Sequence, residues 1–370
     1  MKKYVTRILL VLLVFLLLCI GIFTGIYFTR FRTMSSIQKI SSYDDGYNLY
    51  RMDMKYDYNL DDVINYGITD DQSMIDAILK EALPLLPVKI KAPKFGCTAF
   101  TMTDTDGDIH MGRNYDFKKD TSAMLVYCTP KNGYKSVAFA ALDNVSANIP
   151  DANVKKKLAS LTSPFICLDG MNEKGVSIAV LTLDSDPVHQ DTGKPTISTT
   201  LAIRLVLDRA ASTEEAVTLL KSYDMFASSG RDYHFYITDA SGDGRVIEYD
   251  CNSDTRELVD TKSEAVTNFF ILYKDKVAPN QRNEIYGHGR ERYDAVLNVF
   301  ETEKEHTNTT SWNALKAASQ DPNPVEITSN TQWSINYNNT DLTAEVVLRR
   351  NWDDVVTYDL NTNKLEVQDE

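Results

Sequence analysis

Several residue patterns that mark common kinds of active site are missing from this 370-residue chain. None of its five cysteines forms a Cys-x-x-Cys pair, and none of its five histidines has the spacing of a zinc ligand to another histidine or to a cysteine. The serine-hydrolase elbow Gly-x-Ser-x-Gly, the phosphate-binding loop Gly-x-x-x-x-Gly-Lys and the metalloprotease helix His-Glu-x-x-His do not occur either. We therefore expect neither a metal ion nor a cofactor.

Positive charge is also scarce. The chain has 39 Lys and Arg against 52 Asp and Glu, which gives a formal charge of −13. Nucleic-acid binding needs a basic surface that neutralises phosphates, so we expect no nucleic-acid partner. With 43% hydrophobic residues the composition is otherwise that of a globular protein with a sizeable core.

One long apolar run lies near the start of the chain. Residues 8–28 contain no charged side chain, and a helix of this length spans a hydrocarbon layer of ~30 Å. The short apolar core and small-residue cleavage site of a removable signal peptide are not evident. Basic residues flank the run on both sides, so they give only a weak bias in orientation. We expect residues 1–32 to be a single-pass signal anchor in the cell membrane, with the rest of the chain extracytoplasmic.

The next segment, residues 33–96, is predicted to be a stalk and pro-segment with one helix. Residues 33–67 are polar, rich in Tyr and Asp, and show no clear periodicity. A helix is predicted to begin after Asp70, whose side chain can accept hydrogen bonds from free N–H groups at a helix start. Apolar residues from Met74 to Leu83 lie on one face of this helix, and the prolines at 84 and 87 end it.

Residues 97–370 are predicted to form one domain in which blocks of strands alternate with helices. The turn at Asp104–Asp108 indicates a hairpin; a calcium loop is disfavoured because its glycine and its final acidic ligand are out of place. Segregated blocks favour two sheets covered by helices over a parallel doubly wound sheet. The predicted strands are 97–102, 109–113, 123–128, 136–142, 165–170, 176–183, 232–239, 245–250 and 265–272, and the predicted helices are 199–209, 212–220 and, as the last, 290–300.

A group of reactive residues lies within the first predicted hairpin. Cys97 begins one strand, and Arg113 and Asp116 lie at the end of the next. A guanidinium near a thiol lowers the pKa of the thiol, and a carboxylate can orient an amine, so the group has the parts of an activated cysteine. A buried structural cysteine beside an exposed ion pair is the alternative that the residues alone leave open.

The segment GCTAFTMTDTDGDIHMGRNYDF resembles the motif of the cysteine N-terminal nucleophile hydrolases, the linear amide C–N hydrolases of the choloylglycine hydrolase, penicillin V acylase and acid ceramidase group. The similarity continues in order through GMNEKGVSIAVLTL, DYHFYITDASGDGRVIEY, AVTNFF, GRERYDAV and TQWSINYN. The resemblance implies an α+β fold, a four-layer αββα sandwich, here preceded by the transmembrane helix and pro-segment.

The resemblance also implies a mechanism. The protein cuts its own peptide bond between Gly96 and Cys97, and the α-amine of the liberated cysteine then serves as the base. An unperturbed α-amine has a pKa of ~7.7–8.0, so it can accept the thiol proton without a histidine. A glycine at position 96 suits this reaction because it lacks a Cβ that would hinder approach of the thiol.

Further site residues follow from the same resemblance. Arg113 would support the thiolate and contact the substrate, Asp116 would hold the new α-amine, and Asn268 would donate to the oxyanion. Thr182 stands where relatives carry Asn or Tyr, so its part as a second oxyanion or substrate contact is less firm. Arg290 is the preferred match for a late arginine of the family, with Arg292 as its rival.

The expected function is hydrolysis of a linear amide between an acyl group and a small amine or amino acid, through a thioester on Cys97. Bile-acid, fatty-acyl and aryl-acyl substrates all remain open, as does a homo-oligomer. One alternative is an acyltransferase of the isopenicillin-N acyltransferase type, which passes the acyl group to an amine. Another is a catalytically dead, membrane-tethered scaffold.

Overall fold

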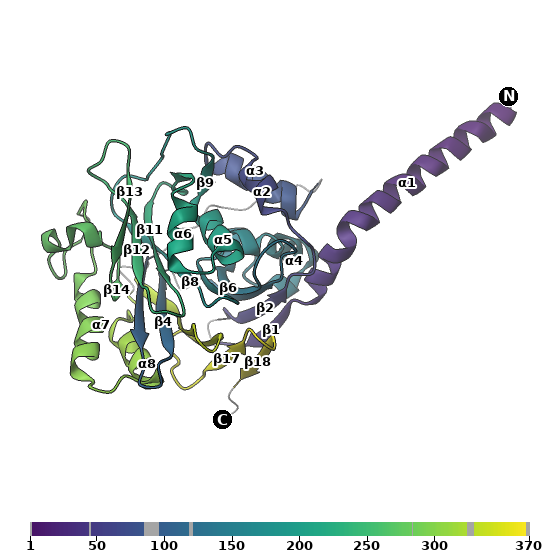
Figure 1. The fold of residues 1–370 in the computed structure, drawn as a ribbon. Coiled ribbons are helices and arrows are strands. Elements are labelled where there is room, and N and C mark those ends of the chain that lie inside the picture. Colours follow the sequence, from purple (N-terminus) through teal and green to yellow (C-terminus); the bar gives the residue numbers. More distant parts are fainter. Residues whose placement is uncertain are drawn as a thin grey trace.

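The computed structural model describes residues 2–43, 46–84, 96–117, 121–282, 284–323 and 329–367. The predicted approach of residues 89–95 to the first strand and the predicted helix stop at position 87 lie outside these ranges. Within them the chain forms two large, mainly antiparallel sheets with helices on their outer faces (Figure 1).

The first sheet has nine strands. Its order is β1 (Gln38–Ser41), β2 (Leu49–Asp53), β5 (Ala123–Cys128), β6 (Ser136–Ala141), β7 (Asp169–Asn172), β8 (Ser177–Leu183), β11 (Asp232–Thr238), β12 (Arg245–Tyr249) and β13 (Leu258–Lys262). All neighbours are antiparallel except β2 and β5, which run parallel.

The second sheet has seven antiparallel strands. Its order is β14 (Ala265–Val266), β3 (Gly96–Thr103), β4 (Ile109–Phe117), β15 (Asn330–Asn338), β16 (Thr343–Leu348), β17 (Val356–Asp359) and β18 (Lys364–Val367). A separate parallel pair joins β9 (Thr196–Ser198) to β10 (Asp224–Phe226). The two large sheets meet where β3 contacts β8 and β11, so β3 lies at the centre of the molecule.

Helices cover the outer face of each sheet. Helix α5 (Thr199–Arg209) packs on β7 and β8, and α6 (Thr213–Leu220) packs on β11. On the other side, α7 (Arg290–Thr302) packs on β3 and β14, and α8 (Asn308–Ala317) packs on β4 and β15. The layers therefore run helices, sheet, sheet, helices. The remaining helical elements are α1 (Lys2–Ser35), α2 (Leu60–Ile64), α3 (Asp71–Ala82), α4 (Val154–Ser160) and the 3-10 turns Leu142–Val145, Pro150–Ala152, Ser163–Phe165 and Ile271–Lys276.

The predicted stalk at residues 33–67 is wrong in one important respect. Its central part forms β1 and β2, and β2 pairs with β5 inside the first sheet. Leu49, Tyr50 and Met52 are fully buried. Strand β2 has only five residues, which is too few for an alternating apolar pattern to be recognised. The polar residues around it therefore dominate what the sequence shows.

Smaller differences concern element ends. The strand predicted at 165–170 begins only at Asp169, and the strand predicted at 265–272 is the two-residue β14 followed by a 3-10 turn. The helix predicted at 290–300 is not the last one, because α8 follows it with a capping box between Thr307 and Thr310. The predicted helix after Asp70 is confirmed as α3, with the Asp70 side chain accepting from the N–H of Ser73.

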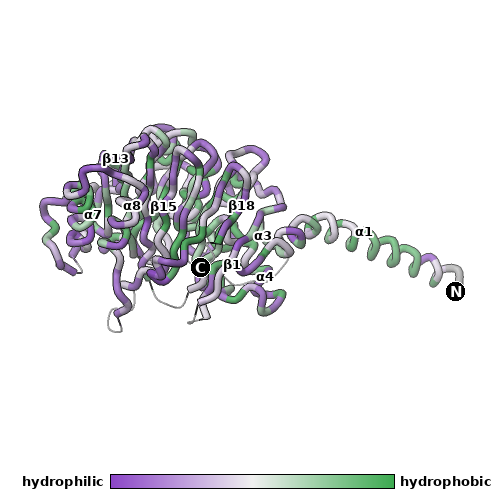
Figure 2. The backbone as a smooth tube through the Cα atoms, turned by 90° about the horizontal axis from the view of Figure 1, so that it is seen from below, coloured by the Kyte–Doolittle hydropathy of each residue, from purple (hydrophilic) through white to green (hydrophobic). Residues whose placement is uncertain are grey.

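Helix α1 projects away from the body (Figure 1), and apolar residues cover most of its length (Figure 2). The most apolar stretch of 18 residues within its segment Tyr4–Ser35 has a mean hydropathy of 3.1, and none of that stretch is buried. By length and composition α1 is suited to crossing a membrane, as both an anchor and a signal sequence would be. Only its last turns pack on the body, where Tyr27, Thr33 and Met34 are buried.

Candidate active site

Cys97 is the second residue of β3, at the contact between the two sheets. Its side chain is fully buried. The backbone N–H of Cys97 donates to Oδ1 of Asn268 at 3.1 Å. The residue therefore has a fixed amide nitrogen, which is the atom that becomes the α-amine if the preceding bond is cut.

The first hairpin brings the predicted residues together. In the β3–β4 register Arg113 lies opposite Ala99, and Asp116 lies opposite Gly96. Arg113 is fully buried, donates to the carbonyl oxygen of Val180 on β8 at 2.9 Å, and has its Nε 3.4 Å from Oδ2 of Asp169. Arg113 thus links the two sheets beside Cys97.

Burial decides the ionisation of the thiol in the uncut chain. It raises the pKa of Cys97 to about 12, and the nearby Arg113 guanidinium opposes this rise without cancelling it. Arg113 lowers the pKa of the thiol, as expected, but desolvation has the larger effect because it disfavours the thiolate when the sulfur is enclosed. At neutral pH the thiol is neutral, so its reaction requires a base close by.

Asp116 is held by three side chains from distant parts of the chain. Oδ1 accepts from the Thr331 hydroxyl at 2.6 Å, and Oδ2 accepts from the Gln320 amide at 2.7 Å. Oδ2 also lies 3.4 Å from a guanidinium nitrogen of Arg292. A bulge in β15 between Thr331 and Trp333 shifts the register there, which places Thr331 opposite Asp116. The carboxylate is therefore fully buried but well satisfied.

Asn268 connects Cys97 to β8. Its Oδ1 accepts from Cys97 and from Arg292, and its Nδ2 donates to the carbonyl oxygen of Thr182 at 2.9 Å. The amide nitrogen carries two hydrogens, so one donor remains beyond this bond. The hydroxyl of Thr182 is buried and has no hydrogen-bond partner among the described residues. Asn268 and Thr182 are thus joined to each other and still offer one N–H and one hydroxyl donor.

The structure places Arg292 in this cluster and leaves Arg290 outside it, so the preference for Arg290 is corrected. Arg292 is buried and donates to the carbonyl oxygen of Cys97 at 2.8 Å, to the hydroxyl of Thr98 at 2.8 Å and to Oδ1 of Asn268 at 2.7 Å. Arg290 instead pairs with Asp294 at 2.8 Å, one turn along the surface of α7. Arg292 shares its helix face with the buried Tyr293 and Val296, and that periodicity was a usable signal.

Two supporting groups were not found from the sequence. Gln320 follows α8 and has no motif around it, so nothing in the sequence marks it. The buried pair of His234 and Glu248 lies behind Asn268: His234 contacts the carbonyl oxygen of Thr267 at 2.9 Å, and Glu248 accepts from the N–H of Ile271. These contacts fix the backbone that carries Asn268.

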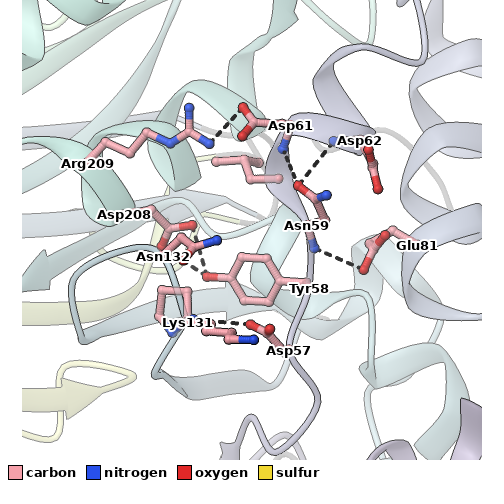
Figure 3. Close-up of a pocket in the computed structure, with 12 residues that line it drawn as sticks. Asp57, Tyr58, Asn59, Asp61, Asp62, Glu81, Lys131, Asn132, Asp208 and Arg209 are labelled. Atoms are coloured by element: carbon pink, nitrogen blue, oxygen red, sulfur yellow. Dashed lines mark hydrogen bonds and ion pairs between the residues drawn. The ribbon is translucent and has the colours of Figure 1, made fainter. Parts of the chain in front are cut away.

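A separate pocket of about 390 Å³ lies away from Cys97 (Figure 3). It forms where residues 57–62 and Glu81 meet the loop at 130–132 and the end of α5, and five of its twelve lining residues are acidic. There the hydroxyl of Tyr58 donates to Asp208 at 2.9 Å, and Arg209 pairs with Asp61 at 2.8 Å. No group of three or more His, Cys, Asp or Glu side chains in the described ranges is arranged to hold a metal ion.

Comparison with protein families finds a match for the part of the chain that begins at Cys97. Residues 97–268 match the linear amide C–N hydrolases of the choloylglycine hydrolase family, and the match begins at Cys97. It confirms the resemblance found in the sequence and, with it, the predicted enzyme class, a hydrolase acting on linear amide C–N bonds.

Solved structures of two kinds share the fold. Penicillin V acylase from Agrobacterium tumefaciens is 18% identical with a TM-score of 0.51, over 72% of this chain and 86% of that one. A variant of the conjugated bile acid hydrolase from Clostridium perfringens is 16% identical with a TM-score of 0.53, over 74% of this chain and 97% of that one. At these identities the likeness concerns the mixed α/β fold.

Proposed function

We propose that the chain is a self-processing amidase that uses Cys97 as its nucleophile and hydrolyses N-acyl amides through a thioester. The observation that carries this proposal is the convergence of Arg113, Asp116, Asn268 and Arg292 on one buried cysteine at the point where the family match begins. Cationic and amide donors around a thiol suit acyl transfer, in which negative charge develops on the carbonyl oxygen.

The first reaction is cleavage of the chain itself. The Cys97 thiol adds to the carbonyl carbon of Gly96, the bond from that carbon to the Cys97 nitrogen breaks, and the nitrogen takes up a proton. Water then hydrolyses the resulting thioester, which leaves a carboxylate on Gly96 and a free α-amine on Cys97. Hydrogen bonds from Cys97 N–H to Asn268 and from Arg292 to the Cys97 carbonyl oxygen hold this residue in position.

Turnover then uses the new amine as the base. It takes the thiol proton, the sulfur attacks the substrate carbonyl, and the second N–H of Asn268, with the hydroxyl of Thr182, stabilises the oxyanion. The substrate amine departs with a proton, and water releases the acyl group as a carboxylic acid. Arg113 supports the thiolate, and Asp116 stabilises the ammonium that forms when the amine takes the thiol proton. The ordinary pKa of an α-amine lies near neutral pH, so the group can gain this proton and pass it on.

The upstream segment stays bound after the cut. Strand β2 lies between β1 and β5 with Leu49 and Tyr50 in the core, and Asp71 accepts from the backbone N–H of Ser229 at 3.0 Å. Cleavage between 96 and 97 leaves all of these contacts in place. The catalytic part therefore remains attached to α1, which serves as a single-pass membrane anchor through residues 8–28, with the body on the extracytoplasmic side.

The test is an activity panel on the purified full chain. Conjugated bile acids, N-acyl amino acids, N-acylethanolamines and penicillin V cover the acyl classes. The uncut Cys97→Ala variant, which has neither the thiol nor a free α-amine at position 97, provides the control. Release of free acid from at least one class supports the amidase. If the acyl group passes to an added amine in preference to water, the chain acts as an acyltransferase.

A further inference from the structure

Helix α1 enters the body without a linker. Residues 8–25 are all exposed, and burial begins at once with Tyr27, which lies inside the uncharged run at 8–28. The 18 exposed residues measure about 27 Å at ~1.5 Å per residue, which is close to the ~30 Å of a hydrocarbon core. If these residues span a bilayer, the surface of the body around the base of α1 is held at the headgroups.

Contacts with α3 make this junction rigid. The Arg30 guanidinium donates to the carbonyl oxygens of Glu81 at 2.6 Å and Ala82 at 2.8 Å, and the Tyr27 hydroxyl donates to the carbonyl oxygen of Pro84. Arg30 also lies over the ring of Tyr56, 4.6 Å from its centre. A charged group held by two carbonyl oxygens of α3 and an aromatic ring leaves the helix little freedom to swing relative to the body.

The element beside this junction is α4, which contacts α1 and lies near its base in both views (Figures 1 and 2). It carries three consecutive lysines, Lys155–Lys157. Two large apolar side chains accompany them on the surface, Val154 with 64% and Ile149 with 42% of its area exposed. Basic residues next to exposed apolar ones match a membrane interface, where the cations meet phosphates and the apolar groups reach the acyl boundary.

The positive charge of the surface around Lys155–Lys157 is unusual for this acidic chain. The protein carries a formal charge of −13, yet none of the three ammonium groups of Lys155–Lys157 has a carboxylate partner among the described residues. The nearby Asp151 accepts a hydrogen bond from the Tyr50 hydroxyl at 3.2 Å, and Asp61, on α2, pairs with Arg209. The lysines are thus available for phosphate groups.

We infer that the surface formed by Ile149, Val154 and Lys155–Lys157 docks on a membrane and binds anionic phospholipid headgroups. The inference rests on the anchor role proposed for α1 and does not depend on the chemistry at Cys97. Docking fixes the orientation of the body relative to the bilayer, so that only one face of the enzyme meets the lipid surface.

Lysine acetylation of the full chain, read by peptide mass spectrometry, tests this surface. The chain is placed in detergent, in nanodiscs of phosphatidylcholine, and in nanodiscs containing phosphatidylglycerol. Acetylation of Lys155 is expected to slow by about fivefold or more in the anionic nanodiscs, since one lysine at an anionic surface gains about that factor in binding. Salt at about 0.5 M should restore much of the rate by screening. Lys304, exposed on the loop between α7 and α8, is the control and should change little.

Three results would overturn the inference. Equal acetylation of Lys155 in all three environments would show that this surface does not meet lipid. Equal protection in both kinds of nanodisc would show closeness to the bilayer without headgroup binding. Failure of the full chain to float with vesicles would show that α1 is not a membrane anchor. Amide hydrolysis by the same sample would still leave the enzymatic proposal intact.

Discussion

Replacing Arg292 by glutamine removes the guanidinium that lies 3.4 Å from Oδ2 of Asp116. Arg292 donates three hydrogen bonds, of 2.7 to 2.8 Å, to Cys97, Thr98 and Asn268. It is buried, so these acceptors have little access to water once it is gone. Breaking a buried ion pair costs ~3–5 kcal/mol of folding free energy because the remaining charge stays buried. We expect a loss of stability of that size in the variant.

The same change should slow chemistry. Without Arg292, the Oδ1 of Asn268 loses one of its two hydrogen-bond donors and the Cys97 carbonyl oxygen is no longer held. Misplacing one oxyanion donor lowers rate by ~10²–10³, so self-cleavage and amide hydrolysis should both fall by about that factor. The assays are the rate of appearance of the cut chain on intact-mass spectra and the rate of acid release from the best substrate of the panel.

Arg290→Gln is the matched control. Arg290 lies two residues away on the same helix, and its pair with Asp294 is partly exposed, so the substitution should cost at most ~1 kcal/mol and leave both rates near those of the parent. Arg292→Lys separates folding from chemistry, since a single ammonium keeps a charge beside Asp116 but cannot reach all of the acceptors. Normal rates in a folded Arg292→Gln protein, or equal losses in the two glutamine variants, would refute the reasoning.

Three further predictions concern the cysteine and its donor. Cys97→Ala should leave the chain full length on intact-mass spectra, whereas the control variant Cys251→Ala should be cleaved like the parent. Normal cleavage of the Cys97→Ala chain would defeat self-processing. Asn268→Ala should fold, as judged by thermal melting, but process and turn over ~10²–10³ more slowly, and a loss under tenfold would exclude an oxyanion role. In the slowly cut Asn268→Ala chain the Cys97 thiol keeps the pKa of about 12 that burial imposes, above its ordinary 9.0, so its alkylation should rise roughly tenfold per pH unit from 7 to 10. A plateau near pH 8 in the Cys97 peptide would contradict this.

Much of the fold was within reach of the sequence. Helix α3 lies where apolar periodicity and its capping residue predicted it, because it buries one regular face. Helix α5 and strand β5 also lie where they were predicted, although both are buried on nearly all sides. Strand β2 could not be found in this way. It is short and flanked by polar residues, and its burial depends on pairing in parallel with β5, which is 70 residues further along the chain.

The same difference between local and long-range contacts applies to the residues of the candidate site. Cys97, Arg113 and Asp116 belong to one hairpin, so local register brings them together and the motif finds them. Arg292 and Gln320 arrive from α7 and from the loop after α8, through contacts that span about 200 positions in sequence. The periodicity of α7 favours Arg292 over Arg290 as the buried residue, but its contact with Cys97 depends on how α7 packs on β3. Burial of the thiol, which controls its pKa, is likewise a property of the packed sheets.

The central claim is that Cys97 becomes an N-terminal residue, and N-terminal sequencing of purified, active protein tests it most directly. The account predicts two chains that remain together in native buffer, one ending at Gly96 and one beginning with Cys97. Active protein in which the peptide bond between these two residues is intact would contradict it.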